Sequence, residues 1–399
     1  MNVYVKELAQ SLARKGVDCD VFTRSTSPLD PLTVEVEPGF KVHHVVVGPR
    51  RPVSKNQLFE LTSSFAEKVL DILDSTSRLR SPFGMGYRID AVHGNYWLSS
   101  LVSAKVSKAM DVPLFTTFHT LTRVKAEASR EFLVDDPMNR EAAEEYLTDR
   151  SDAIFASCTV EATQLVKLYN ANPSKVHVIS PGVDHALFGP GERRMARSAV
   201  RLPQDVPVIL FVGRIQHLKG ADLAVATLAE LESFPSARLI IIGGPSGSLG
   251  REELHKLRVQ ANELGIADRV HFLPPQPHEL LSTYYRAANI CLAPSRVESF
   301  GLVALEAAAC GLPVVASKVG GLSTLVEHGI TGFLVDSFSP GDLARAVSEI
   351  LSDTTLATRM ARRSISLARR YSWSNTASKV IDVYARIANE LDADSVAAC

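Results

Sequence analysis

The chain has 399 residues, of which 46% are hydrophobic and 22% are charged. This composition excludes a disordered, collagen-like or disulfide-scaffold protein, and the length suits two or three domains. The 43 Lys and Arg residues nearly balance the 44 Asp and Glu residues, so that the net charge is −1. No global field therefore favours nucleic acid or anionic lipid, and any phosphate site must be local.

The cysteines are odd in number and widely scattered (Cys19, Cys158, Cys291, Cys310 and Cys399). That pattern is typical of reduced thiols in a cytoplasmic protein rather than of disulfides or a zinc site. Apolar runs stay shorter than about 18 residues, so we expect no membrane span. The N-terminus, MNVYVKELAQ, contains charges from the start and does not resemble a signal peptide.

Short β-branched runs alternate with helical stretches along the whole chain. The predicted strands cover residues 17–23, 41–47, 89–93, 113–118, 153–157 and 175–180, and then 206–212, 237–243, 269–273, 290–293, 313–316 and 333–335. The apolar character of VPVILFVG and ARLIIIGG predicts burial on both sheet faces. Alternation with helices predicts an α/β fold with parallel sheets, and two successive sets of strands predict two Rossmann-like domains.

A domain boundary is predicted within GPGERRMARSAVR, residues 189–201, because Gly and Pro mark a loop there and a buried strand follows. The first domain would cover residues 1–193 and the second residues 194–371. Residues 372–391 form one predicted amphipathic helix with Ser372 as its N-cap.

The chain opens inside a predicted helix, with Val5, Leu8 and Leu12 on one face and Gly16 at its end. A doubly wound domain normally begins with a strand and a glycine-rich turn, and neither precedes this helix. That strand would lie at the centre of the sheet, so its absence should leave its neighbours unpaired. Two explanations stay open: a start further upstream, which we favour, or a compromised first domain.

The segment FVGRIQHLKG places Arg214 and Lys219 directly after a buried strand. Ligands of open α/β sheets bind at the carboxyl ends of the strands. Two cations at a strand-to-helix turn suit a diphosphate, and helix N-terminal amides would add donors. The alternative is a solvated loop with ordinary surface cations.

The segment PSRVESFGLVALEAAACGLPVVA carries Glu298 and Glu306, eight residues apart, around a helix predicted to start at Gly301. Glu306 would lie about two turns into that helix, where its carboxylate can accept both hydroxyls of a ribose. Glu298 could bind sugar hydroxyls or balance charge near a diphosphate. A capping carboxylate with a buried salt bridge is the alternative, and the downstream GLPVVASKVGGLSTLVEHGITGFLV strengthens the functional interpretation.

Two further turns follow strands. IIGGPSGS departs from G-x-G-x-x-G, so a dinucleotide fingerprint is not supported. The backbone of FLPPQPHEL could bind a nucleobase edge, although a plain connecting turn is an equal alternative.

Taken together, Gly213-Arg214 with Lys219, the Glu298-x7-Glu306 motif and GGLSTLVEHGITGFLV resemble the retaining glycosyltransferases of family 4, which have the GT-B fold. The resemblance covers essentially the whole chain. It implies two Rossmann-like domains that face a cleft, with the last helix crossing back to the first domain.

The first half, through MNVYVKELAQSLARKGVDCDVFTR, GNYWLSS and TTFHTL, resembles the mycothiol-pathway enzymes that transfer N-acetylglucosamine from UDP-GlcNAc to 1D-myo-inositol 3-phosphate. This resemblance implies an acceptor site at Asn2, Lys55, Tyr96, Thr120 and Arg140, a donor site at Arg214, Lys219, Gln276, Glu298 and Glu306, and catalytic roles for Arg214, Lys219, His119 and Glu298. The family's leading strand and GDxGG loop are absent, and Gln276 stands where these enzymes usually carry Arg.

The resemblance also implies a homodimer and Mg²⁺ bound by the backbone carbonyls of Tyr285, Arg286 and Ala288, whose oxygen chemistry suits a hard cation. No cofactor is required for the chemistry, and a UDP-sugar is the co-substrate. Transfer to an aminocyclitol in natural-product biosynthesis, and a catalytically impaired N-truncated homologue that acts as a partner subunit, remain alternatives. A GT-B phosphorylase is a third, although no lysine stands out as a site for pyridoxal phosphate.

Overall fold

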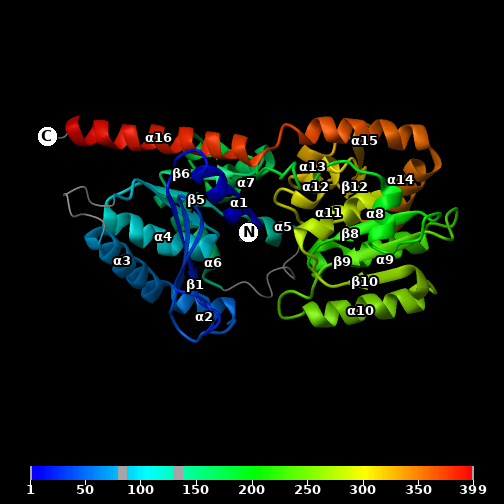
Figure 1. Ribbon diagram of the computed structural model, residues 1–399, viewed down its shortest axis with the longest axis horizontal. Coiled ribbons are helices and arrows are strands. Elements are labelled where there is room, and N and C mark those ends of the chain that lie inside the picture. Colours follow the sequence, from blue (N-terminus) through cyan, green and yellow to red (C-terminus); the bar gives the residue numbers. More distant parts are fainter. Residues whose placement is uncertain (1, 80–87, 129–137, 398–399) are drawn as a thin grey trace. The chain divides into compact units, whose positions relative to one another are not determined.

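The computed structural model describes residues 2–79, 88–128 and 138–397, which fold as two compact units (Figure 1). Unit 1 contains the chain up to residue 127, residues 138–180 and the chain from residue 373. Unit 2 contains residues 181–372. Each unit has its own sheet system and its own core, and each is described by itself below.

Unit 2 is built on one sheet with the strand order β10-β9-β8-β11-β12-β13, in which all neighbouring strands are parallel. Its strands are β8 (Val208–Val212), β9 (Arg238–Ile242), β10 (Val270–Leu273), β11 (Ile290–Ala293), β12 (Val314–Ser317) and β13 (Gly332–Val335). The chain order reverses between β8 and β11. This is the switch point of a doubly wound sheet, where ligands bind at the carboxyl ends of the strands.

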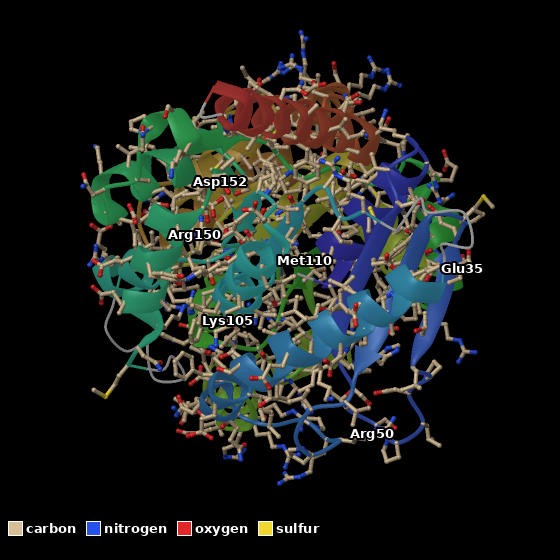
Figure 2. The ribbon with its side chains drawn as sticks, turned by 90° about the vertical axis from the view of Figure 1, so that its left-hand side faces the viewer. Glu35, Arg50, Lys105, Met110, Arg150 and Asp152 are labelled. Atoms are coloured by element: carbon tan, nitrogen blue, oxygen red, sulfur yellow. The ribbon has the colours of Figure 1, made fainter. Side chains whose placement is uncertain are left out.

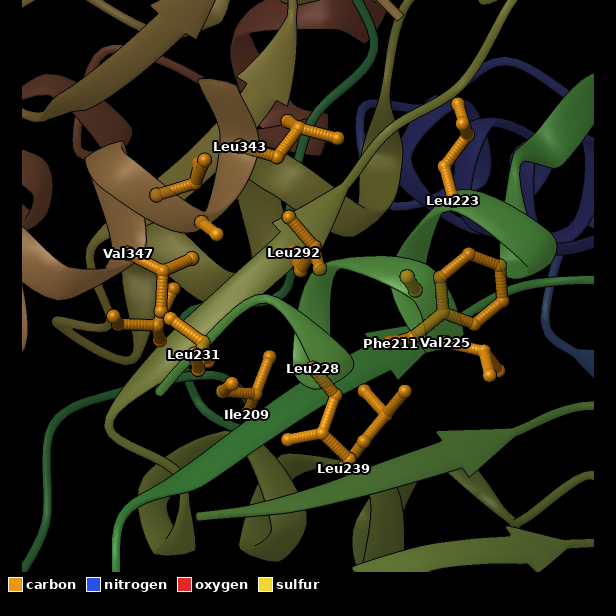
Figure 3. Close-up of a cluster of buried hydrophobic side chains, with 14 of the residues drawn as sticks. Ile209, Phe211, Leu223, Val225, Leu228, Leu231, Leu239, Leu292, Leu343 and Val347 are labelled. Carbon is orange, nitrogen blue, oxygen red and sulfur yellow. The ribbon is translucent and has the colours of Figure 1, made fainter. Parts of the chain in front are cut away.

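A core of unit 2 packs residues of α9, α10, α14 and α15 against its sheet, and Figure 3 shows the part formed with α9 and α14. The helices of the unit are α8 (Arg193–Ala199), α9 (Ala221–Ala229), α10 (Gly250–Glu263), α11 (His278–Ala287), α12 (Leu302–Ala309), α13 (Leu322–Leu325), α14 (Pro340–Ser352) and α15 (Thr354–Ala368). Ile209 and Phe211 of β8 pack with Leu228 of α9 and Val347 of α14, all at most 2% exposed. Full burial of β8 explains its unbroken apolar sequence.

Unit 1 has two separate sheets. The larger has the order β4-β5-β6-β7 and is entirely parallel, and the smaller has the order β1-β3-β2. The strands are β1 (Cys19–Arg24), β2 (Thr33–Glu37), β3 (Phe40–Val45), β4 (Val92–Asn95), β5 (Leu114–Thr117), β6 (Ala153–Ala156) and β7 (Val176–Val178). In the described part of the chain, β1 and β4 each pair with one strand only.

All the predicted strands overlap observed strands, but β2 was not among them. It pairs antiparallel to β3 across a turn in which Gly39 has φ +81°, so the expectation of purely parallel sheets is wrong at this edge. Its sequence, TVEVE, has two valines that alternate with charges. A polar edge strand of this kind carries little apolar signal.

The helices of unit 1 are α1 (Asn2–Ala13), α2 (Lys55–Glu60), α3 (Thr62–Leu79), α4 (Trp97–Met110), α5 (Thr122–Ala128), α6 (Arg140–Arg150), α7 (Thr159–Tyr169) and α16 (Trp373–Ala397). Lys105 of α4 donates to Ser63 Oγ of α3 at 2.6 Å, and Asp152 accepts from the Leu114 N–H at 2.7 Å where β5 begins (Figure 2). No helix in the described ranges is both long and apolar enough to span a membrane.

The C-terminal helix α16 packs against unit 1, as the sequence predicts. Trp373, Ala377 and Val380 of α16 are buried in one apolar cluster with Tyr4 and Leu8 of α1. The chain thus returns after unit 2 to complete the core of the unit in which it began.

The continuous part of unit 2 begins at Pro181. The Val183 N–H donates to the Tyr371 carbonyl at 3.4 Å, and His185 Nε2 lies 3.0 Å from the same oxygen. These bonds tie the connecting segment to the end of unit 2, a pairing between distant residues that local loop signals do not reveal.

His93 of β4 lies between α16 and β5, with its Nδ1 2.7 Å from the Tyr384 hydroxyl and its Nε2 2.8 Å from Thr117 Oγ1. Burial lowers the pKa of His93 to about 4. Unfolding exposes the ring, which then binds a proton near pH 6.5. The unfolded state therefore takes up more protons, and stability should fall by up to about 1.4 kcal/mol per pH unit as the pH drops from about 6.5 towards 4.

We expect His93→Gln to flatten this dependence and the exposed His255→Gln to leave it unchanged. Urea denaturation between pH 4.5 and 7.5 measures the slope. An unaltered slope in His93→Gln would show that other groups control the acid sensitivity.

Candidate functional site

In unit 2, the loop after β8 lies directly against the loop after β11. The Leu218 carbonyl accepts from the Arg296 N–H at 2.8 Å, and the Arg296 guanidinium donates to the His217 carbonyl at 2.8 Å and pairs with Asp222 at 2.6 Å. Both loops leave the sheet at the carboxyl edge of adjacent parallel strands. The structure thus brings the two sequence segments singled out for this unit to one place.

Lys219 and Glu298 form an ion pair between these loops. Lys219 Nζ lies 2.7 Å from Glu298 Oε2, and both side chains are 19% exposed. Arg214, in the same loop, is exposed, and no hydrogen bond or ion pair joins it to another described side chain. Its guanidinium remains available to an anion, while the Lys219 ammonium has two donors beyond the one directed at Glu298.

Two glycines bring the loop after β12 against the loop after β11, which carries Glu298. A Cβ on Gly320, which has φ +47°, would lie 1.7 Å from the Glu298 carbonyl oxygen, and one on Gly321 would lie 2.4 Å from the backbone of Phe300. The Gly321 N–H also donates to the Glu298 carbonyl at 3.3 Å. Only glycine permits this approach of two backbones.

Glu306 lies in the second turn of α12, slightly nearer the helix start than the sequence predicted, and its side chain is largely buried. Tyr285 of α11 donates its hydroxyl hydrogen to Glu306 Oε2 at 2.8 Å. Burial raises the pKa of Glu306 to about 7, and the hydrogen bond from Tyr285 opposes this rise. The pKa of Tyr285 is well above its usual value because the ring is buried beside the carboxylate.

The remaining predicted residues of unit 2 lie on or next to α11. Gln276 Nε2 donates to the Pro274 carbonyl at 2.8 Å, so this side chain folds onto its own loop. Tyr285, Arg286 and Ala288 occupy the C-terminal turn of α11, where backbone carbonyls lack helical donors. Free carbonyls are suitable ligands for a hard cation, and among the described residues no cluster of three His, Cys, Asp or Glu side chains offers another metal site.

In unit 1, the structure gathers three of the predicted acceptor residues. Arg140 Nη2 donates to the Thr120 carbonyl at 2.8 Å and to Thr120 Oγ1 at 3.0 Å. Arg140 Nη1 lies 3.4 Å from the Tyr96 hydroxyl, and the guanidinium sits 5.1 Å from the centre of that ring. Tyr96 and Thr120 follow the adjacent strands β4 and β5, and Arg140 begins α6.

Arg140 is fully buried and is held there by a buried carboxylate, Glu144, one turn along α6. Glu144 accepts from Arg140 Nε at 2.7 Å, from the Thr122 N–H at 2.9 Å and from the Tyr169 hydroxyl. A buried charge requires such a partner, and breaking the pair by removing one member typically costs about 3–5 kcal/mol.

His119 lies next to this cluster with an unusual backbone. It has φ +62°, its Nε2 is 3.0 Å from Asn95 Oδ1, and its ring meets the Tyr4 ring edge-on at 4.7 Å. Burial lowers its pKa to about 3, so the imidazole is neutral at pH 7. A neutral ring bound to Asn95 through one nitrogen can offer the other to a hydroxyl.

The last two predicted acceptor residues begin helices near these groups. Asn2 starts α1, the helix that brings Tyr4 to His119. Lys55 starts α2 after the Ser54 cap, and Phe59 of α2 stacks on Trp97 at 5.8 Å, beside Tyr96. Both helices thus contact residues that follow β4 or β5, through Tyr4 and Phe59, and Asn2 and Lys55 stand at their N-terminal ends.

The sequence matches two family models in succession. Residues 1–187 match the model described as Glycosyltransferase Family 4, and residues 192–366 match that of Glycosyl transferases group 1. A protein of Acidothermus cellulolyticus named D-inositol 3-phosphate glycosyltransferase is 42% identical over 389 residues, 96% of this chain and 85% of that protein. The chain belongs to glycosyltransferase family 4.

Further relatives support the same family and fold. A D-inositol 3-phosphate glycosyltransferase of Mycolicibacterium smegmatis is 43% identical over 97% of this chain and 86% of its own length. Among solved structures, a sucrose-phosphate synthase from Thermosynechococcus elongatus has a TM-score of 0.86 at 31% identity and covers 97% of this chain and 93% of its own. The predicted family and GT-B fold are confirmed.

Three side chains of this glycosyltransferase site were not predicted: Asn95, Glu144 and the hydroxyl of Tyr285. Asn95 lies within GNYW, and Glu144 stands four residues after Arg140, a spacing that favours a helical ion pair. The position of Asn95 and the spacing of Glu144 could both have been recognised from the sequence. Tyr285 and Glu306 are 21 residues apart on two helices, so that only the tertiary fold reveals their contact.

The backbone contact at Gly320 allows a test with a matched control. We expect Gly320→Ala to be less stable than Gly329→Ala by about 1–3 kcal/mol, the usual cost of overpacking. Both glycines have positive φ and share that strain, but a Cβ on Gly329 meets nothing within 4 Å. Urea denaturation of both variants measures the difference in the free energy of unfolding. Equal values would show that the loop carrying Glu298 can move to accommodate the new Cβ without a loss of stability.

Proposed function

We propose that this glycosyltransferase moves N-acetylglucosamine from UDP-GlcNAc to 1D-myo-inositol 3-phosphate and retains the anomeric configuration. The observation that carries the proposal lies at the carboxyl ends of β4 and β5, where the buried Arg140 guanidinium donates to Thr120 Oγ1 and lies 3.4 Å from the Tyr96 hydroxyl, so that it orients two hydroxyls beside a positive charge. Such donors suit a phosphate monoester. The relatives named D-inositol 3-phosphate glycosyltransferase support the same acceptor.

Unit 2 is assigned the donor. Arg214 and Lys219 supply positive charge for the diphosphate after β8, and Glu306 supplies an acceptor for the ribose hydroxyls. Gln276, near the start of α11, is assigned to the nucleobase side. Anabaena Alr3699/HepE, about 20% identical to this chain, has been solved in complex with UDP and with UDP-glucose.

The proposed chemistry is front-face displacement without an enzymatic nucleophile. The bond between the anomeric carbon and the diphosphate oxygen breaks, and the bond to the acceptor oxygen forms on the same face. The acceptor's proton passes to the departing diphosphate oxygen. Arg214 and Lys219 stabilise the negative charge that develops there. His119 contacts the donor sugar, and Asn2 and Lys55 complete the acceptor site. Mg²⁺ at the α11 carbonyls and a homodimer stay predictions and enter no step.

A donor-by-acceptor screen tests the proposal. The chain is incubated with UDP-GlcNAc or UDP-glucose and with inositol 3-phosphate, inositol or an aminocyclitol, and products are identified by mass spectrometry. The expected product is N-acetylglucosaminyl inositol phosphate, with the α-anomer seen by NMR. Transfer to the aminocyclitol alone would replace the acceptor assignment, and an inverted product would exclude the mechanism.

Removal of the exposed cation should impair the chemical step with every acceptor. We expect Arg214→Ala to lower kcat about 10²–10³-fold, as the loss of an oxyanion donor does. Arg359→Ala, an exposed arginine of α15, is the matched control and should retain full activity. Steady-state kinetics with saturating donor provide the measurement, and a normal kcat in Arg214→Ala would remove this residue from the mechanism.

Removal of acceptor cations should affect only phosphorylated acceptors. We expect Lys55→Ala and Arg140→Ala to raise KM for inositol 3-phosphate about tenfold or more, since hydrogen bonds to charged groups are worth about 1.5–3 kcal/mol. Arg140→Ala should also lower the stability of unit 1, because Glu144 loses its buried partner, so urea denaturation accompanies the assay of this variant. UDP affinity, measured by calorimetry, should stay unchanged and shows that unit 2 is intact. The exposed Lys108→Ala is the control. If both variants keep a normal KM, the acceptor carries no phosphate.

A further inference from the structure

The contact between Tyr285 and Glu306 stands apart from the loops described so far because it joins two helices. Tyr285 is fully buried on α11, and its ring meets Phe188 edge-on at 5.9 Å. Glu306, on the adjacent α12, is 8% exposed. The tyrosine hydroxyl lies 2.8 Å from Oε2 of the glutamate.

This hydrogen bond is the only one that the Glu306 carboxylate makes within the described ranges. Oε2 is engaged by Tyr285, and no described group bonds to Oε1. A buried carboxylate normally has several donors, because an incompletely bonded one is costly. Glu144 of unit 1 illustrates the usual case, with donors from Arg140, Tyr169 and a backbone N–H. The free acceptor capacity of Glu306 indicates a ligand that brings hydroxyl or N–H donors.

We propose that Tyr285 is a positioning residue: its hydroxyl fixes the Glu306 carboxylate so that Oε1 faces the ribose hydroxyls of the sugar nucleotide. The inference rests on the proposed function, in which Glu306 binds the ribose. It adds a residue that touches no substrate and acts through the glutamate.

The physical reason lies in the stiffness of the two side chains. Glutamate has three rotatable bonds, and without a partner it would lose binding energy in ordering them each time a ligand arrives. Tyrosine has only two, and the packing of Phe188 against the Tyr285 ring restricts them further. Tyr285 therefore holds Glu306 in one orientation before the nucleotide binds, and preorganisation of this kind increases affinity.

The test compares two probes that differ only in the ribose. Calorimetry measures the affinity of UDP and of 2′,3′-dideoxy-UDP for the wild type, Tyr285→Phe and Tyr284→Phe. Tyr284 is the matched control because it precedes Tyr285 on α11, is also largely buried, and its hydroxyl bonds to no described group. We expect Tyr285→Phe to weaken UDP roughly 5- to 30-fold and to leave the dideoxy probe unchanged, because the freed Glu306 side chain must then be ordered each time the ribose binds. Tyr284→Phe should change neither.

A double-mutant cycle with Glu306→Gln identifies the route of the effect. If Tyr285 acts through Glu306, Tyr285→Phe causes little further loss of UDP affinity in the Glu306→Gln background. Equal weakening of both probes by Tyr285→Phe would indicate general disturbance of packing and would overturn the inference, as would unchanged UDP affinity. Neither result affects the proposed function if Glu306→Gln distinguishes UDP from the dideoxy probe less well than the wild type does. A wild type that binds UDP and the dideoxy probe equally would instead refute the role of Glu306 in both.

Discussion

The position of the acidic side chains in unit 2 depends on one contact between two backbones. Gly320 and Gly321 pack against the chain from Glu298 to Phe300, so closely that any Cβ there would overlap main-chain atoms. The contact fixes the backbone of the loop that carries Glu298, and the Glu298 side chain forms an ion pair with Lys219. A strand order that puts β11 between β8 and β12 makes all three loops neighbours. The chemistry of this edge thus follows from sheet topology and from the absence of two side chains.

In unit 1, a buried ion pair fixes the position of the site side chains. Arg140 and Glu144 are both inaccessible to solvent, and the hydrogen bonds of Glu144 to Tyr169 and to the Thr122 N–H fix the pair relative to α5 and α7. The guanidinium can then direct its remaining donors at Thr120 and Tyr96 without rotating. Such a site is expensive to assemble but is already ordered before a ligand arrives.

The sequence was sufficient for the parts of the fold that depend on burial. The strand β8 and all of β9 after Arg238 are apolar and almost fully buried, and both strands were predicted within a residue or two. The edge strand β2 was missed because its outward residues are charged. Among site residues, Lys219 and Glu298 were predicted by motif, but their 2.7 Å contact was not, since 79 residues separate them. Periodicity reports what one element buries, whereas pairing between distant elements depends on the register of the whole sheet.

The two glutamates of the family motif illustrate how environment divides similar groups. Glu298 precedes α12 and faces a cation, whereas Glu306 lies inside α12, buried beside a hydroxyl, where burial raises its pKa. Attraction to Lys219 holds Glu298 where an incoming anion would also be attracted, so the ammonium must divide its donors between the carboxylate and the anion. No cation in the described part of the chain forms an ion pair with Glu306, which is suited to neutral hydroxyl donors. A single eight-residue spacing therefore yields one carboxylate that adjusts the charge of the site and one that accepts hydrogen bonds. The difference arises because the helix begins at Gly301, between them.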